Sequence, residues 1–237
     1  MPDKALSASA DNDLAAVVPF PRLGVKRRPP RARILEAMLE TSGELGYENV
    51  AVRHVIERAK TSRATFYKNF ADLEDCFAEA YDEAAEWLYR RVMSAARRQS
   101  GWREGLRAGM AELLELCSRQ PLTARALFVE VHAAGERALA RRNELMGRFA
   151  EAIDGEREGQ DGETPGVTAT FMVGAIETMI TAKLMDGDAK SIPDLLPGIL
   201  HFVVLQYLGE EAAWEEMTAA PLAQWSARRE AASELPS

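Results

Sequence analysis

Side chains that can donate hydrogen bonds stand on one side of a short predicted helix within residues 50–70. Arg63 and Lys68 can donate to guanine edges or to phosphate oxygens. Phe66 and Phe70 fall on the opposite side of the same helix and are expected to face a core. A short helix with an apolar back and a donor-rich front can enter the major groove of DNA. The chemistry indicated by this stretch is hydrogen bonding to DNA.

Two short helices joined by a tight turn are predicted to position these donors. Apolar residues of the first helix recur at three- and four-residue spacing, at Val52, Val55, Ile56 and Ala59. The turn is expected at residues 59–61. Ser62 then stands where an N-cap residue accepts from the free amides of the second helix.

The charge distribution favours nucleic acid at one end of the chain only. The net charge of the 237 residues is -8 at pH 7, which by itself argues against nucleic acid. Residues 22–70, however, contain 11 Lys and Arg against 5 Asp and Glu, and the rest of the chain is acidic. A basic segment on an acidic body suits phosphate binding by that segment.

Residues 1–30 are expected to form a disordered arm, because they are rich in Pro, Ser, Ala and Asp and show little apolar periodicity. Arg27, Arg28 and Arg31 cluster where this arm ends. The cluster could follow the DNA backbone or enter the minor groove, or it could be a solvated linker. The sequence leaves both interpretations open.

Several motifs between residues 33 and 77 occur in the order and spacing of one known family. They are Ile34-Leu35-Glu36-Ala37, Gly46-Tyr47, Thr65-Phe66-Tyr67 followed by Phe70, and Asp72-Leu73-Glu74-Asp75. This stretch resembles the DNA-binding domain of TetR-family transcriptional regulators. The resemblance implies an all-α fold, with an N-terminal three-helix helix-turn-helix domain and a larger helical regulatory and dimerisation domain. The implied domains are a basic arm (1–30), a DNA-binding head (31–77), a ligand-binding and dimerisation body (78–209) and a C-terminal extension (210–237).

The expected DNA contacts come from the residue types and from this resemblance, in which Tyr67 matches a phosphate-contacting tyrosine. They are Arg27, Arg28, Arg31, Arg53, Lys60, Ser62, Arg63, Thr65, Tyr67, Lys68 and Asn69. The chain departs from the family at Ala51, where relatives usually carry a capping Thr that touches a phosphate; Asn49 is a candidate substitute cap. It departs again at Lys60, where relatives usually carry Gly, and a left-handed Lys would cost about 1 kcal/mol.

The rest of the chain is predicted to be helical, with segments at 72–98, 101–119, from 121, 136–154, 167–185 and 191–208, and with an extra helix after Gly209. The resemblance implies that this body binds a small-molecule effector. Candidate lining residues are Trp102, Met110, Phe128, His132, Met146, Phe149, Phe171 and Met179. Core packing is the alternative for most of them. His132 is the strongest candidate because it is polar on an otherwise apolar helix.

Residues 199–205 are apolar on nearly all sides of their predicted helix, so both faces must be covered. One face is expected to meet the core and the other a second subunit, which agrees with the four-helix homodimer interface that the resemblance implies. The expected interface residues are Ile176, Ile199, Phe202, Val203 and Tyr207. A dimer would pair two heads on a palindromic operator in double-stranded DNA.

No arrangement for catalysis or metal binding stands out. His54, His132 and His201 match no metal-ligand spacing, and the sequence holds no GxSxG motif or phosphate-binding glycine loop. Cys76 and Cys117 are expected to be buried free thiols in a reducing cytoplasm. No cofactor and no enzyme activity are expected, and no membrane helix, because the chain has no run of 18 apolar residues.

The sequence therefore predicts a cytoplasmic, dimeric, ligand-responsive transcriptional regulator, a repressor released from its operator by a small apolar molecule. Two alternatives stay open. In one, the regulator answers to a protein partner or to no ligand. In the other, which belongs to a different class, the chain is a helical carrier or enzyme that retains a vestigial DNA-binding head.

Overall fold

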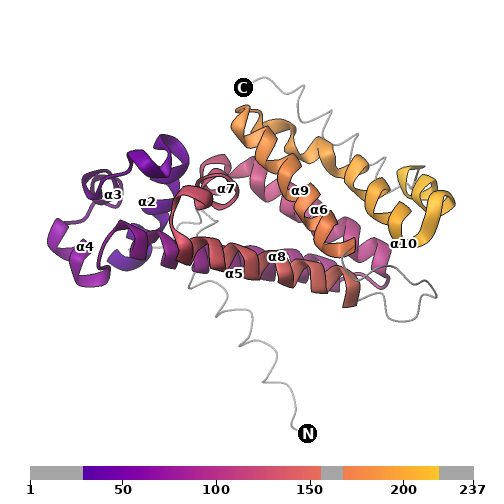
Figure 1. The fold of residues 1–237 in the computed structure, drawn as a ribbon, viewed down its shortest axis with the longest axis horizontal. Coiled ribbons are helices and arrows are strands. Elements are labelled where there is room, and N and C mark those ends of the chain that lie inside the picture. Colours follow the sequence, from indigo (N-terminus) through magenta and orange to yellow (C-terminus); the bar gives the residue numbers. More distant parts are fainter. Residues whose placement is uncertain (1–28, 156–167, 219–237) are drawn as a thin grey trace, which may run out of the picture. The chain divides into compact units, whose positions relative to one another are not determined.

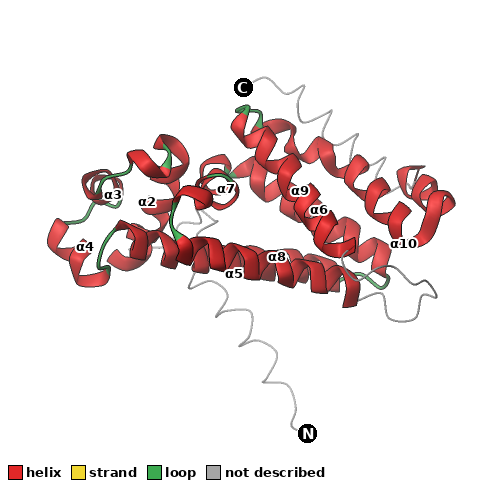
Figure 2. Cartoon of the chain, viewed as in Figure 1, coloured by secondary structure: helices red, strands yellow, loops and turns green. Residues whose placement is uncertain are grey.

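The computed structural model describes residues 29–155 and 168–218, and within these ranges the chain is helical throughout, with no strand (Figures 1 and 2). The α-helices are α2 (Pro30–Leu45), α3 (Val52–Arg58), α4 (Arg63–Asn69), α5 (Leu73–Arg97), α6 (Trp102–Arg119), α7 (Pro121–Phe128), α8 (Glu136–Gly155), α9 (Thr168–Met185) and α10 (Leu196–Thr218). Three 3-10 helices, η1 (Tyr47–Asn49), η2 (Glu130–Ala133) and η3 (Ala189–Leu195), lie between them. The predicted all-α class is confirmed.

The chain divides into two compact units, each with its own internal packing. Unit 1 contains residues up to Arg90 together with Gln120–Asn143, and unit 2 contains Arg91–Arg119 and the chain from Glu144 onward. The predicted head therefore shares a unit with α7 and η2, although α7 begins only at Pro121. The functional boundary predicted between residues 77 and 78 is not tested by this division and stays a prediction.

The core of unit 1 forms where α2 packs against α3, α4 and α7. The side chains of Ile34, Met38, Val55, Phe66 and Phe77 are completely buried there. Burial of such side chains is worth about 1.5–3 kcal/mol each. This packing holds the two short helices in place, since helices as short as α3 and α4 are unstable alone.

Unit 2 is built on contacts of α6 with η3 and α10. The buried sides of α9 and α10 carry Ile176, Ile180, Ile199, Leu200 and Val203. By length and composition the segment Ala189–Thr218 could also cross a membrane, with a mean hydropathy of 1.3. That is weak evidence, because the core helix of a soluble protein passes the same test.

Two predicted helices are shorter than expected, and each has a local cause. The helix that begins at Pro121 ends at Phe128, and His132 lies in η2, where the amide of His132 bonds to the carbonyl three residues back. The helix expected from Ser191 begins at Leu196, because Pro193 has no amide to donate and leaves a 3-10 turn before it. The predicted extra helix is present as residues 210–218, after a break at Gly209.

Both cysteines are buried free thiols within the described residues, as predicted. Burial in apolar surroundings raises the pKa of the Cys117 thiol to about 12 and raises the pKa of Cys76 as well. Because the thiolate is the reactive form, both side chains are chemically inert in the folded chain.

Candidate nucleic-acid interface

Helix α4 carries the donor-rich front, and its N-terminus is capped as the sequence predicts. The Ser62 hydroxyl accepts from the Thr65 amide at 3.1 Å. On the back of the helix, Phe66 is completely buried and Phe70 nearly so, and their ring centroids lie 5.7 Å apart. An apolar back held in the core fixes which side of α4 faces solvent.

The front of α4 presents Arg63, Tyr67 and Lys68 to solvent. The Arg63 guanidinium lies 5.7 Å from the Tyr67 ring centroid, one helical turn away, and Tyr67 is 49% exposed. The ring preorganises the guanidinium without using its N–H donors, so these stay available for a base edge or a phosphate. Arg53 on α3 is exposed as well.

Two residues predicted as DNA contacts already have partners within α4. The Thr65 hydroxyl lies 2.9 Å from the Ser62 hydroxyl, and the Asn69 amide nitrogen donates to the Thr65 carbonyl at 2.7 Å. Both side chains are only partly exposed. Ser62, Thr65 and Asn69 thus stabilise the helix itself, whereas Arg63, Tyr67 and Lys68 present their donors to solvent.

The first turn of α3 lacks the side-chain cap that the family resemblance implies. Ala51 has the extended backbone of an N-cap residue (φ -124°, ψ 154°), but no side chain there accepts a hydrogen bond. Its own amide donates to His54 Nδ1 at 3.2 Å. Asn49 does not replace the cap, since α3 has no side-chain cap hydrogen bond, and the Asn49 amide nitrogen donates instead to the Leu45 carbonyl at the end of α2. The expectation for Asn49 is wrong.

Replacing Ala51 with threonine is expected to stabilise the protein by about 1 kcal/mol, because a hydroxyl at this N-cap would accept a free amide of α3. The same hydroxyl could reach a phosphate, so affinity for DNA should rise as well. Urea unfolding measures the first effect and a DNA-binding titration the second. Valine at the same position is the matched control, since it has the same shape and no acceptor; equal stability of the two variants would contradict the cap.

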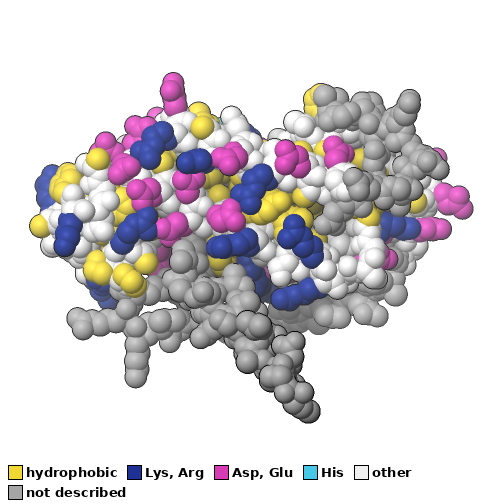
Figure 3. Space-filling model, turned by 90° about the horizontal axis from the view of Figure 1, so that it is seen from below, with side chains coloured by type: hydrophobic (Ala, Val, Ile, Leu, Met, Phe, Trp, Pro, Cys, Tyr) yellow, Lys and Arg dark blue, Asp and Glu magenta, His cyan; other side chains and the backbone are white. Residues whose placement is uncertain are grey.

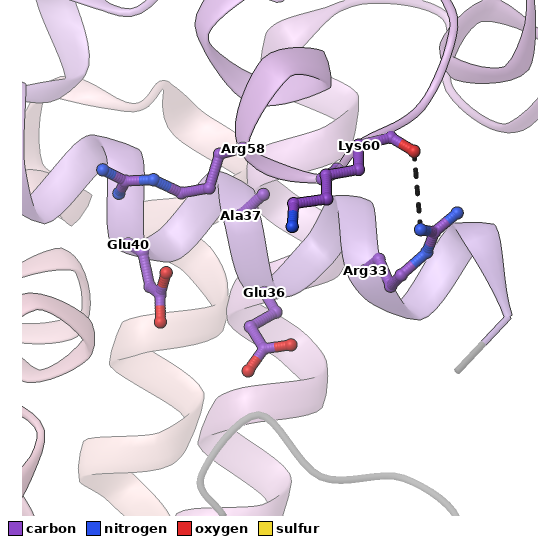
Figure 4. A pocket seen from close by; sticks show the side chains of 7 residues that line it. Arg33, Glu36, Ala37, Glu40, Arg58 and Lys60 are labelled. Atoms are coloured by element: carbon purple, nitrogen blue, oxygen red, sulfur yellow. Dashed lines mark hydrogen bonds between the residues drawn. The ribbon is translucent and has the colours of Figure 1, made fainter. Parts of the chain in front are cut away.

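The turn between α3 and α4 holds Lys60 in the left-handed region, with φ 50°, as predicted. Arg33 on α2 donates to the Lys60 carbonyl at 3.4 Å, and Arg33, Lys60, Arg58 and Glu40 border a groove of about 250 Å³ (Figure 4). Arg58 is paired with Glu44. The groove therefore mixes both signs of charge, and its arginine contact helps to hold the strained turn.

Arg31 has an intramolecular role that the sequence did not indicate. Its guanidinium pairs with Glu79 and Glu83 of α5 and lies 5.8 Å from the Phe70 ring centroid. These carboxylates raise the pKa of Arg31 above its ordinary value. Arg31 therefore fastens α2 to α5, and a DNA contact would have to compete with two ion pairs. Arg27 and Arg28 lie outside the described residues.

The start of α5 is acidic where the head ends. Asp72 accepts from the Asp75 amide, and Asp75 accepts from the Ala71 amide at 3.1 Å and from Arg137 at 2.9 Å. The hydrogen bond from Arg137 holds the pKa of Asp75 below its ordinary value. Figure 3 shows the wider pattern, in which basic and acidic side chains alternate over the face in view. Basic donors are exposed on α3 and α4, whereas the face in view carries both signs of charge.

The eight candidate effector residues are distributed over both units. Phe128 is buried and His132 is exposed in unit 1, whereas the other six belong to unit 2. Met146 and Phe149 pack on a small cluster formed by Ala150, Ala169 and Val173, and Met110 is buried. Trp102 donates from its indole nitrogen to the Ile153 carbonyl, and Phe171 and Met179 are exposed on α9.

Of the five candidate interface residues, four are buried inside the chain itself and one is exposed. The buried four are Ile176, Ile199, Val203 and Tyr207. The Tyr207 hydroxyl donates to Asp154 at 2.7 Å, which explains its place inside. Phe202 alone among the five is exposed, at 43%. The exposed apolar side of α9 instead carries Phe171, Met179 and Met185, whose side chains the sequence had not assigned to an interface.

Comparisons with known proteins identify the head and the fold. Residues 34–80 match the model of the family described as bacterial regulatory proteins, tetR family. The fatty acid degradation regulator FadR of Bacillus halodurans has a similar structure, with a TM-score of 0.67 and 16% identity over 76% of this chain and 97% of that chain. The regulator TylP of Streptomyces fradiae is similar with a TM-score of 0.64 and 15% identity over 84% of this chain and 97% of that one.

A third similar structure is FadR of Bacillus subtilis in complex with stearoyl-CoA, with a TM-score of 0.59 and 19% identity over 75% of this chain and 97% of that chain. No curated protein sequence matches this chain significantly. At these identities the solved structures establish a shared fold, and the family model carries the assignment of the head.

Proposed function

Since the chain belongs to the tetR family of bacterial regulatory proteins and is a DNA-binding transcriptional regulator, we propose that it is a homodimeric repressor of a palindromic operator. The exposed front of α4 carries this proposal: Arg63 lies over the Tyr67 ring and Lys68 stands beside them, on a helix capped by Ser62. Arg63 reads a base edge, and Tyr67 and Lys68 hold phosphates.

A second copy of the chain is proposed to cover the exposed apolar side of α9 and α10. Phe171, Met179 and Met185 on α9 and Phe202 on α10 are large apolar side chains that are 37–74% exposed. Between residues 168 and 182, the only charged side chain of α9, Glu177, is buried. An uncharged, apolar helix side of this kind marks a protein interface. A twofold axis there would present two α4 helices to two half-sites.

The body is proposed to bind a small effector that releases the repressor from its operator in the cytoplasm. The support is the similar FadR structure that contains stearoyl-CoA. Release requires only that the effector favour one of two arrangements of the dimer, since binding at one site then lowers affinity at the other. No enzymatic activity is proposed.

The direct test is binding of the purified protein to DNA fragments from around its own gene, in a salt series. Tight binding to one fragment, weakening steeply as salt rises, is expected because phosphate contacts release counterions. Arg63→Ala should weaken that binding by about 1–3 kcal/mol and relax base preference at one position. Tyr67→Phe should cost about 1 kcal/mol, because it removes one phosphate hydrogen bond.

The matched control is Arg90→Ala, which removes an exposed arginine of α5 whose ion pair with Glu86 is long, at 3.9 Å. Its affinity should equal that of the unmodified protein. If Arg63→Ala and Tyr67→Phe also bind the operator unchanged, α4 is not the reading helix.

A further inference from the structure

A fully buried carboxylate lies between two arginines in unit 2. Glu216 is 0% exposed, and each of its carboxylate oxygens pairs with a different arginine. Oε1 lies 2.6 Å from Arg107 Nε and Oε2 lies 3.2 Å from Arg103 Nε. The two arginines are one turn apart on α6, so both guanidinium groups point to the same side of the helix. Arg103 and Arg107 together can bind an oxyanion, and in this structure the Glu216 carboxylate of the same chain lies between them.

Glu216 lies on a short helical segment, residues 210–218, that is separated from the rest of α10 by a non-helical residue. Gly209 has φ 84° and ψ -179°, which interrupts the helix, and residues 210–218 follow at an angle, in yellow in Figure 1. Beyond its own stretch of helix, no atom of the described residues lies within 4 Å of the position that a Cβ would take at Gly209. The backbone there is accessible and of the kind that only glycine adopts easily, so this position can serve as a hinge.

Polar contacts dominate the attachment of residues 210–218. Besides the Glu216 pairs, Arg103 donates to the Ala212 carbonyl at 3.1 Å and lies 3.2 Å from Glu215. Apolar packing contributes little to this attachment. Ala213 is buried, but Trp214 is 57% exposed, with its ring centroid 5.0 Å from that of His201. A segment held mainly by carboxylates that pair with Arg103 and Arg107 is held by contacts that another anion can replace.

We propose that Arg103 and Arg107 form an effector site for an oxyanion, a carboxylate or a phosphate, and that Glu216 occupies this site in the absence of the effector. The effector displaces Glu216, and residues 210–218 swing away at Gly209. The planar guanidinium groups suit the paired oxygens of either anion. Removing the carboxylate without a replacement would leave two cations facing each other in a partly buried place, so the site favours an exchange of anions over an empty state.

This inference names the chemical class of the effector and to that extent rests on the proposed function. Its test uses no DNA, so a failure of the anion site and a failure of operator binding can be told apart. The probes are sodium phosphate and sodium acetate, compared with sodium chloride at equal ionic strength. A response to phosphate alone, or to acetate alone, decides between the two anions.

The first experiment is thermal unfolding of the full-length protein with Glu216→Ala. Without the internal carboxylate, Tm should be lower in chloride and should rise by roughly 5 °C in millimolar phosphate or acetate, because the arginine pair gains a ligand. The unmodified protein and Glu215→Ala, which removes the exposed neighbour, should rise by less than half as much. The double variant Glu216→Ala with Arg107→Ala should lose the rise. An equal response in all four proteins overturns the site.

The second experiment follows the hinge in the unmodified protein and does not depend on how well a variant folds. Amide hydrogen exchange of residues 210–218 should become at least about tenfold faster in saturating phosphate or acetate than in chloride, because the segment is released. Exchange in α6 should not accelerate. If exchange in 210–218 is unchanged by both anions, Glu216 is a fixed structural partner and the proposal is wrong.

Discussion

Replacing Gly43 with alanine is expected to destabilise unit 1 by about 3 kcal/mol or more. A Cβ at residue 43 would lie 2.7 Å and 2.9 Å from the carbonyl carbon and Cα of Leu122, and closer still to its carbonyl oxygen. All three are backbone atoms of α7, so no side-chain rotation relieves the clash. Helices α2 and α7 would have to move apart.

The neighbours of Gly43 show that α2 and α7 are packed closely through small side chains. Thr41 and Ser42 are buried, and their hydroxyl oxygens have no hydrogen-bond partner among the described residues. Just beyond, the Tyr47 amide donates to Glu130 of η2 at 2.9 Å. Moving α7 would therefore also strain the contact that joins η1 to η2.

The measurement for Gly43→Ala is thermal and urea unfolding, with an expected fall in Tm of roughly 6–12 °C. Gly147→Ala is the matched control, because residue 147 is also a helical glycine but no neighbouring group in the described part of the chain lies within 4 Å of the Cβ position. That change should be neutral or stabilising by up to about 1 kcal/mol, since alanine favours a helix. Equal stability of Gly43→Ala and the unmodified protein would show that α2 and α7 are not in close contact in solution.

Replacing Phe202 with aspartate is expected to split the proposed dimer and, with it, operator binding. An unpaired charge buried in an interface costs about 3–5 kcal/mol, and a twofold axis places two such charges in one interface. The dimer Kd should therefore rise by more than about a thousandfold. Because a single head makes half of the operator contacts, affinity for the operator should fall at least about a hundredfold.

Light scattering measures the mass of the Phe202→Asp protein, and circular dichroism checks that it remains folded. Leu45→Asp is the matched control, since Leu45 on α2 is 41% exposed against 43% for Phe202 and does not lie on α9 or α10. Its mass should stay that of the dimer. A dimeric Phe202→Asp protein would place the interface elsewhere. Val203→Asp is unsuitable for this test, because Val203 is completely buried and the change would unfold the protomer.

The sequence by itself determined the features of the head that depend on neighbouring residues. The N-cap at Ser62 and the buried Phe66 and Phe70 follow from local spacing, and the left-handed Lys60 follows from the family resemblance, in which relatives usually carry Gly at this position. Helical periodicity decides which side of α4 is apolar, and one capping hydroxyl decides where the helix begins. These interactions span only a few residues, so they can be predicted without knowing what packs against the helix.

Tertiary structure decided what those local patterns leave open. From the sequence, Arg31 was assigned to a basic arm, but in the structure it pairs with Glu79 and Glu83. Nothing in the sequence distinguished Glu216 from the other acidic residues, but in the structure it pairs with two arginines of α6. In α9 and α10 the sequence is apolar on nearly all sides, so periodicity could not tell the buried Val203 from the exposed Phe202. Only the packing of distant segments selects the side of such a helix that faces the core. The reason is that the hydrophobic effect is non-directional and favours burial of any apolar side equally.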